Sequence, residues 1–205
     1  MTDDPDNWPR YEVGQPKHIH ALGVVAAMYN HLEFALFCLT LDYAGLTNKT
    51  TQWLFANTSN NTRLDLLKRS VTEKEANPSV KDSVLHFADC FDICAENRNI
   101  LMHSMVNKAE DAAILNFAKA SRNDPSRVNT LNLRLEDIRR TADEIATVYS
   151  YGTRLHTYFI TNNSTLTPEF YKIPEDMQTW LRALPNKPAL PSKLSKPNPP
   201  TPKAG

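Results

Sequence analysis

The fold is decided by residues 79–104, SVKDSVLHFADCFDICAENRNILMHS, which follow Pro78. Apolar residues recur in this stretch at steps of three and four, the period of one helix face. Proline favours the first helical turn, where its missing N–H is not needed. The stretch therefore predicts a long amphipathic helix that runs from about Ser79 past His103. Its stripe consists of Val84, Phe87, Phe91, Cys94, Arg98, Leu101 and Met105.

Stripes of the same period predict further helices on both sides. A first long helix should end near Gly45, two shorter helices should cover 50–56 and 62–76, and a last long helix should begin at Glu136. Residues 113–118 and 128–135 flank an Asn-Asp-Pro-Ser turn, which favours a hairpin. We therefore expect a mainly all-α fold, an antiparallel bundle of four to five helices with a small β-hairpin inserted before the last long helix.

The 205 residues divide by composition into one domain and two ends. Residues 1–14 form an acidic N-terminal extension, and residues 15–184 form the predicted bundle. Residues 185–205 hold seven of the 14 prolines together with four lysines. Such a segment has too little apolar surface to offset its ordering entropy, which predicts a disordered tail.

Charge and cysteine content limit the classes of function. Lys+Arg and Asp+Glu are both 23, so any binding to nucleic acid must come from a local cluster. The N-terminus lacks the basic and apolar regions of a secretory signal, and the longest apolar run, 34–41, is much shorter than the roughly 20 residues that span a bilayer. The odd number of cysteines, three, suits a reducing compartment. We expect a cytoplasmic protein with no membrane partner.

Arg98 occupies a core-facing position of the predicted helix 79–103. A guanidinium keeps its charge, so its burial requires a carboxylate or an anionic ligand. Glu33, beside the stripe of the first helix, is the expected structural partner, and Glu96 is a second candidate for orienting the site.

Asn99 and His103 lie one turn apart on the neighbouring face of the same helix. Arg98 and His103 are separated by about 140° around the axis and about 7.5 Å along it. A phosphate held by both residues requires that the arginine reach around the helix, that the helix distort, or that a second subunit complete the site.

The segment Arg98-Asn99-Ile100-Leu101-Met102-His103 resembles the motif of the HEPN superfamily, an arginine, a polar residue, a short spacer and a histidine. HEPN proteins are helical bundles, and many are metal-independent ribonucleases of toxin–antitoxin, phage-defence and RNA-processing systems. The motif stands late in a long helix and precedes a hairpin and another long helix, as in some members. The resemblance covers about residues 15–184.

The resemblance implies an endoribonuclease, a toxin or phage-defence effector that needs no cofactor and no metal. Arg98 would contact the phosphate and the transition state, Asn99 would orient the site, and His103 would be the general acid or base. It also implies a homodimer in which two motifs face one cleft, and a cognate antitoxin as a possible protein partner. Basic residues of the hairpin region would follow an RNA backbone, namely Lys119, Arg122 and Arg127.

Other interpretations of these residues stay open. Arg98 and His103 can be a structural ion pair and a helix-terminal histidine. The chain can also be a noncatalytic HEPN-like module that binds nucleotides or proteins, and the hairpin charges can be an ordinary solvated surface. His86, Cys90 and Cys94 share a helix face on which zinc could bind, but the sequence offers no fourth ligand.

Overall fold

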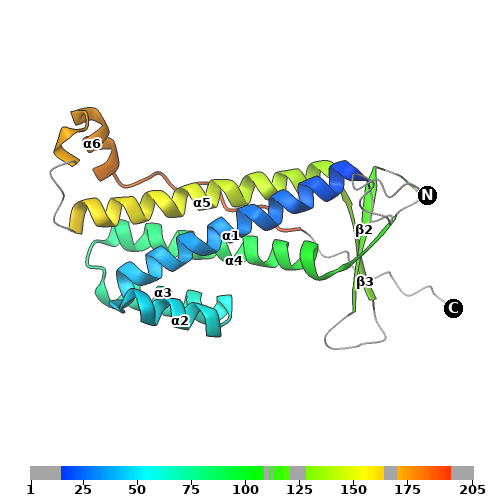
Figure 1. Cartoon of the computed structure of the whole chain (residues 1–205), viewed down its shortest axis with the longest axis horizontal. Helices are drawn as coiled ribbons and strands as arrows, with labels where there is room; N and C mark the ends of the chain where they lie inside the picture. Colours follow the sequence, from blue (N-terminus) through cyan, green and yellow to red (C-terminus); the bar gives the residue numbers. More distant parts are fainter. Residues whose placement is uncertain (1–14, 109–110, 112, 121–127, 164–169, 195–205) are drawn as a thin grey trace, which may run out of the picture.

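The computed structural model describes residues 15–108, 111, 113–120, 128–163 and 170–194. The described part is mainly helical with one small antiparallel sheet, as predicted (Figure 1). In chain order its elements are α1 (Pro16–Ala44), α2 (Asn48–Asn57), α3 (Asn60–Lys74), α4 (Pro78–His103), β1 (Met105–Lys108), β2 (Ile114–Ala120), β3 (Val128–Arg134), α5 (Leu135–Asn163), a 3-10 turn (Phe170–Lys172) and α6 (Glu175–Arg182).

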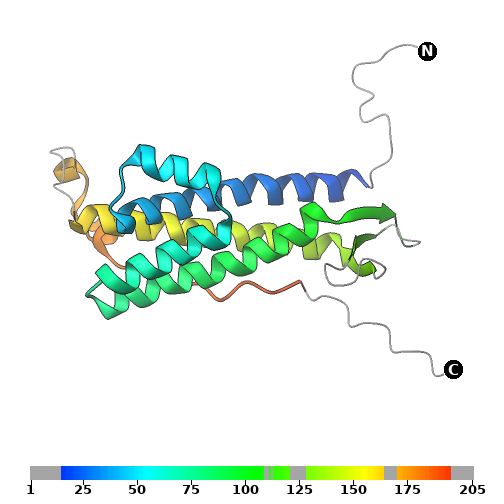
Figure 2. The same ribbon diagram turned by 90° about the horizontal axis from the view of Figure 1, so that it is seen from below.

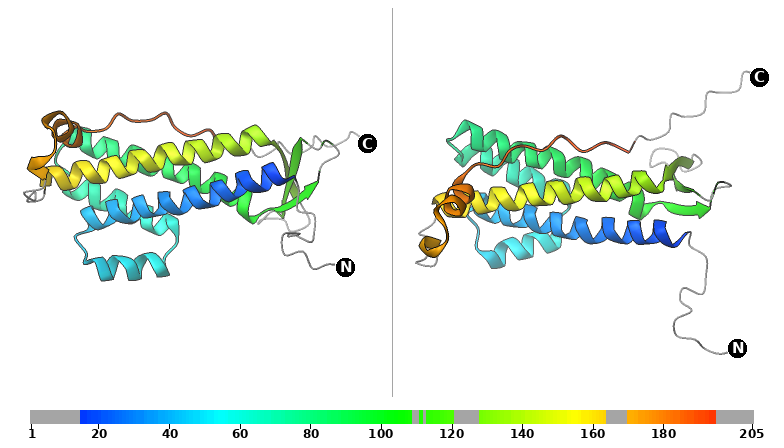
Figure 3. Two further views of the ribbon diagram at one scale, coloured as in Figure 1. Left: turned by 45° about the horizontal axis from the view of Figure 1, so that its top comes forward. Right: turned by 90° about the horizontal axis from the view of Figure 1, so that it is seen from above.

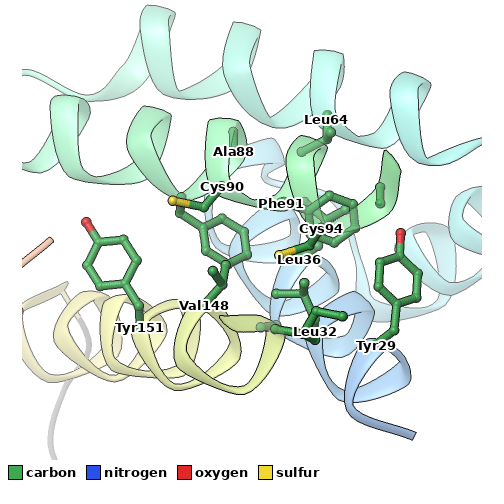
Figure 4. Close-up of a cluster of buried hydrophobic side chains, with 14 of the residues drawn as sticks. Tyr29, Leu32, Leu36, Leu64, Ala88, Cys90, Phe91, Cys94, Val148 and Tyr151 are labelled. Carbon is green, nitrogen blue, oxygen red and sulfur yellow. The ribbon is translucent and has the colours of Figure 1, made fainter. Parts of the chain in front are cut away.

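The long helices α1, α4 and α5 lie side by side and enclose the core (Figure 1). Their predicted apolar stripes are the buried faces, and Figure 4 shows Leu32 and Leu36 of α1 packing beside Phe91 of α4 and Val148 of α5. Helix α1 ends at Ala44 and is capped by Gly45, whose φ of 67° is the left-handed conformation that glycine adopts without strain.

Short polar residues begin the middle helices. The side chain of Thr47 accepts a hydrogen bond from the Thr50 N–H at the start of α2, and Ser59 caps α3 in the same way. Asn77 accepts bonds from two N–H groups of α4, at 3.0 and 3.4 Å. These caps satisfy amides that have no partner inside the helix, which explains why the polar residues at these positions mark helix starts.

The sheet lies beyond the carboxyl end of α4, in the strand order β1-β2-β3 (Figure 1). The predicted hairpin is β2 and β3, in which Leu115 pairs with Leu133. Strand β1 follows α4 after Ser104 alone and pairs Val106 with Phe117. The residues Arg98 to His103 therefore occupy the last turns of a helix that leads directly into a sheet.

Among the described residues, α1 is the one helix that is long and apolar enough to cross a bilayer by length and composition. A core helix of a helical bundle passes the same test, and α1 buries its predicted stripe in the core. The absence of a membrane partner and the cytoplasmic location stay predictions.

Residues 184–194 form an extended segment along the bundle, which we call the C-terminal strap (Figures 2 and 3). Pro191 and Leu194 of the strap are buried. The prediction of disorder is therefore wrong for 185–194. Its contacts use backbone atoms, which composition does not register: His86 of α4 bonds the carbonyl of Pro188 at 2.8 Å. Residues 195–205 and the acidic extension, 1–14, lie outside the described residues.

Candidate active site at the end of helix α4

Arg98 and His103 touch each other at the exposed end of α4. The Arg98 Nη1 donates a hydrogen bond to His103 Nε2 at 2.8 Å, and it lies 3.3 Å from the side-chain oxygen of Asn99, to which it also donates. Helix α4 is continuous through His103. The arginine thus reaches along a regular helix, and neither a distortion nor a second subunit is needed to bring the two side chains together.

The contact defines the form of the imidazole. Arginine has N–H donors and no acceptor, so the Nε2 atom of His103 must accept with its lone pair. The imidazole in this arrangement is neutral and carries its proton on Nδ1. His103 and Asn99 are exposed while Arg98 is half-buried, so the pair is open to solvent on the histidine side.

The buried side of the Arg98 guanidinium faces Tyr29 of α1. The Arg98 Cζ atom lies 5.3 Å from the centre of the Tyr29 ring, within the range of a cation–π interaction. Tyr29 is 2% exposed, and burial, followed by the charge of Glu33, raises the pKa of its phenol. The Nε atom of Arg98 is buried without a hydrogen bond in the described part of the chain. An aromatic face therefore takes the place that a carboxylate was predicted to fill.

Glu33 does not form the predicted ion pair with Arg98. Its Oε1 atom accepts a hydrogen bond from Asn60 at 2.9 Å and lies 3.6 Å from Arg63 Nη1. The reason is its position on α1: Glu33 is one turn after Tyr29 and faces α3, which supplies both partners. Glu33 reaches Arg98 indirectly, because Asn60 also donates to the Tyr29 hydroxyl at 2.7 Å.

Arg63 extends this polar network to α2. Its Nη1 donates to the Asn60 side-chain oxygen at 2.7 Å, and its Nη2 donates to the carbonyl oxygen of Phe55. Tyr29 and Asn60 are the members that sequence reasoning missed. Tyr29 stands in the apolar stripe of α1 and Asn60 in an Asn-rich turn, so neither position signals a role beside Arg98.

Glu96 faces the C-terminal strap, where its carboxylate lies 3.7 Å from the Lys193 ammonium. The neighbouring Asn97 is 1% exposed and was not singled out in the sequence. Its amide donates to the Ser192 carbonyl at 2.8 Å and accepts from the Leu194 N–H at 2.9 Å. Glu96 and Asn97 thus join the motif-bearing turn to the strap.

Of the three basic residues predicted to follow an RNA backbone, only Lys119 lies within the described part of the chain. Lys119 is half-buried on β2, opposite Asn129 of β3. Arg122 and Arg127 lie outside the described residues. The role of all three in RNA binding stays a prediction.

Cys90 and Cys94 belong to the interior of the bundle, and His86 beside them is half-buried. The imidazole Nε2 of His86 lies 3.5 Å from the sulfur of Cys90 and bonds the strap carbonyl of Pro188. Burial raises the pKa of Cys90 to about 11 and that of Cys94 to about 12, which disfavours the thiolate that zinc binding requires. Within the described ranges, no group of three or more His, Cys, Asp or Glu residues is placed to hold a metal ion.

A scan against protein-family models, a search of curated proteins and a search of solved structures each gave no match. The likeness to the HEPN superfamily therefore rests on the Arg98 to His103 motif and on its position at the end of a long helix.

Proposed function

We propose that this protein is a metal-independent endoribonuclease of the HEPN type, acting as a toxin or phage-defence effector. The observation that carries the proposal is the 2.8 Å contact between Arg98 and His103 on the solvent side of α4. It places a permanent positive charge beside a histidine whose Nε2 lone pair can act as a base once Arg98 turns toward a phosphate, and the two residues are of the types that the motif requires.

RNA can be cleaved through its own 2′-hydroxyl, which attacks the adjacent phosphorus and expels the 5′-oxygen. In the proposed reaction the His103 Nε2 takes the proton of the 2′-hydroxyl, a role that contributes about 10²- to 10⁴-fold to a rate. Arg98 turns from His103 toward the phosphate and stabilises the negative charge that builds on its oxygens. The leaving oxygen takes its proton from the imidazolium so formed, or from His103 of a second subunit.

Asn99 and Tyr29 support this arrangement from two sides. Asn99 accepts a hydrogen bond from Arg98, which favours one orientation of the guanidinium. The Tyr29 ring supports the half-buried part of the guanidinium and leaves its charge uncompensated. An ion pair with Glu33 would instead neutralise that charge. Arg98 therefore keeps its full charge for a phosphate.

The test is cleavage of RNA by the purified protein in EDTA. Wild type should cleave, and Arg98→Ala and His103→Ala should each lower the rate by about 10²-fold or more. Arg69→Ala and His20→Ala are matched controls, because both residues are exposed and lie on other helices. The proposal fails if wild type cleaves none of a set of structured and single-stranded RNAs, or if the two motif variants cleave as fast as wild type.

A noncatalytic module that binds nucleotides or a protein is the second candidate. It is favoured by the contacts of Arg98 to His103, Asn99 and Tyr29, which already engage the guanidinium within the chain. In that case calorimetry should detect nucleotide or protein binding that Arg98→Ala weakens, and wild type should leave RNA intact.

The proposed partners are RNA, a second copy of the chain and a cognate antitoxin protein. A dimer would bring a second His103 to the substrate and supply a separate proton donor. Light scattering of the eluted protein at several concentrations measures the oligomeric state, and a mass of one chain throughout would remove the two-motif cleft.

A further inference from the structure

The last turns of α4 are held from two sides. On one side the Arg98 guanidinium packs on Tyr29 of α1. On the other side Asn97 is bonded to Ser192 and Leu194 of the C-terminal strap. Because consecutive residues of a helix point about 100° apart, these two contacts act on the same turn in different directions.

Asn97 is suited to clamp a peptide backbone. Its side-chain amide uses its oxygen and its nitrogen on backbone groups two residues apart, much as a neighbouring strand would. The bond to Leu194 is buried and the bond to Ser192 is partly buried, because Asn97 is 1% and Leu194 6% exposed while Ser192 is exposed. The Ser192 N–H also donates to Glu144 of α5 at 3.1 Å, so the strap connects α4 to α5 at this level.

We propose that Asn97 is a positioning residue for the Arg98–His103 pair, and that the C-terminal strap is the element against which it fixes the pair. The inference rests on the proposed function for its kinetic consequence. Asn97 precedes Arg98 directly, so a shift or loosening of this turn changes where the guanidinium and the imidazole stand. Misplacement of a reacting group by about 1 Å can cost about 10²-fold in rate.

The other end of the strap provides a control. Lys187 pairs with Asp82 about four turns earlier on α4, where Asp82 is largely exposed. Lys187→Ala removes an exposed strap contact far from the motif. If the strap only stabilises the bundle as a whole, loss of the Asn97 bonds should accelerate amide exchange along all of α4, whereas a positioning role predicts an effect confined to the turn that bears the motif.

The experiment compares full-length Asn97→Leu, Leu194→Ala and Lys187→Ala with wild type. Asn97→Leu removes both hydrogen bonds and keeps a side chain of similar size. Leu194→Ala loosens the strap at the clamp and leaves the sequence of α4 unchanged. If Asn97→Leu does not fold, Leu194→Ala alone tests the positioning role. Amide hydrogen exchange in residues 97–103 should accelerate about 10-fold or more in the first two variants and stay unchanged in Lys187→Ala. With RNA, kcat should fall about 10- to 100-fold while KM changes less than about twofold.

The two readouts separate this inference from the proposed function. Unchanged exchange in residues 97–103 in both clamp variants overturns the positioning role, whatever the RNA assay gives. Faster exchange together with an unaltered kcat also overturns it. If wild type cleaves no RNA, the proposed function fails, whatever the exchange experiment gives. If exchange in residues 97–103 also does not accelerate in the clamp variants, the positioning role of Asn97 fails as well.

Discussion

Gly152 of α5 faces both Ala35 of α1 and Phe87 of α4, and its replacement by alanine gives a prediction with a definite sign. A Cβ atom at this position would lie 3.1 Å from the Cβ of Ala35 and 3.0 Å from Cδ2 of Phe87, and closer still to Cε2 of the same ring. Phe87 is fully buried and packs on Phe91 with 6.2 Å between ring centres, so the ring has no free space into which to move.

Two opposing terms set the size of the effect. Overpacking of a close-packed core costs about 1–3 kcal/mol, while alanine gains about 1 kcal/mol over glycine in a helix interior. With the tight contacts here, Gly152→Ala should lower the free energy of unfolding by about 1–2 kcal/mol. For a chain of this length that is a fall in Tm of about 2–8 °C.

Gly23 of α1 is the matched control. It is exposed and helical, and a Cβ atom there would meet nothing within 4 Å. Gly23→Ala should therefore raise the free energy of unfolding by up to about 1 kcal/mol. Urea unfolding followed by far-UV circular dichroism measures both variants. Stabilisation of the protein by Gly152→Ala, as large as that by Gly23→Ala, would refute the packing of α1, α4 and α5 described above.

Two further predictions follow from buried ionisable groups. Burial raises the pKa of Cys38 and Cys90 to about 11 and that of Cys94 to about 12. At pH 8 a disulfide reagent should therefore label the native protein at least about 100-fold more slowly than the same protein unfolded in guanidinium. Fast labelling of the native protein would contradict this prediction. Burial also raises the pKa of the Asp42 carboxyl, and this effect outweighs the 2.7 Å hydrogen bond with His156, which lowers the pKa. The contribution of Asp42 to the free energy of unfolding is therefore present at low pH and is lost as the pH rises through the raised pKa. The advantage of wild type over Asp42→Asn in urea unfolding should therefore shrink as pH rises above about 4, and an advantage that grows with pH would show that the bond to His156 prevails.

The long helices were predictable because the buried face of each one appears in the sequence as a stripe of apolar residues with a period of about 3.6. The misses are two elements too short for this pattern to identify them. Strand β1 was missed because Met105 continues the spacing of the α4 stripe, although it is 67% exposed and begins a strand. Helix α6 has only eight residues, and its apolar Met177, Trp180 and Leu181 keep helical spacing although none of its residues is buried.

The candidate site was predictable in its members and not in its surroundings. Spacing along one helix is enough to place Arg98, Asn99 and His103 near one another. Which neighbour supports Arg98 depends on how α1 is rotated about its axis relative to α3 and α4. With the observed rotation, Tyr29 packs on Arg98, and Glu33 lies beside Arg63. The clamp of Asn97 was hidden for another reason, since it recognises backbone atoms of the strap, which any sequence could supply.

The order of synthesis gives the C-terminal strap one more consequence. Residues 184–194 leave the ribosome after all the helices, and domains begin to fold from the N-terminal side as they emerge. Until then the side-chain amide of Asn97 lacks the two bonds that the strap gives it, and His86 lacks its bond to the Pro188 carbonyl. The nascent chain can thus assemble its bundle while the turn that bears Arg98 is still held from one side. If this chain cleaves RNA, docking of the C-terminal strap on α4 would be the step that brings the activity to its full value.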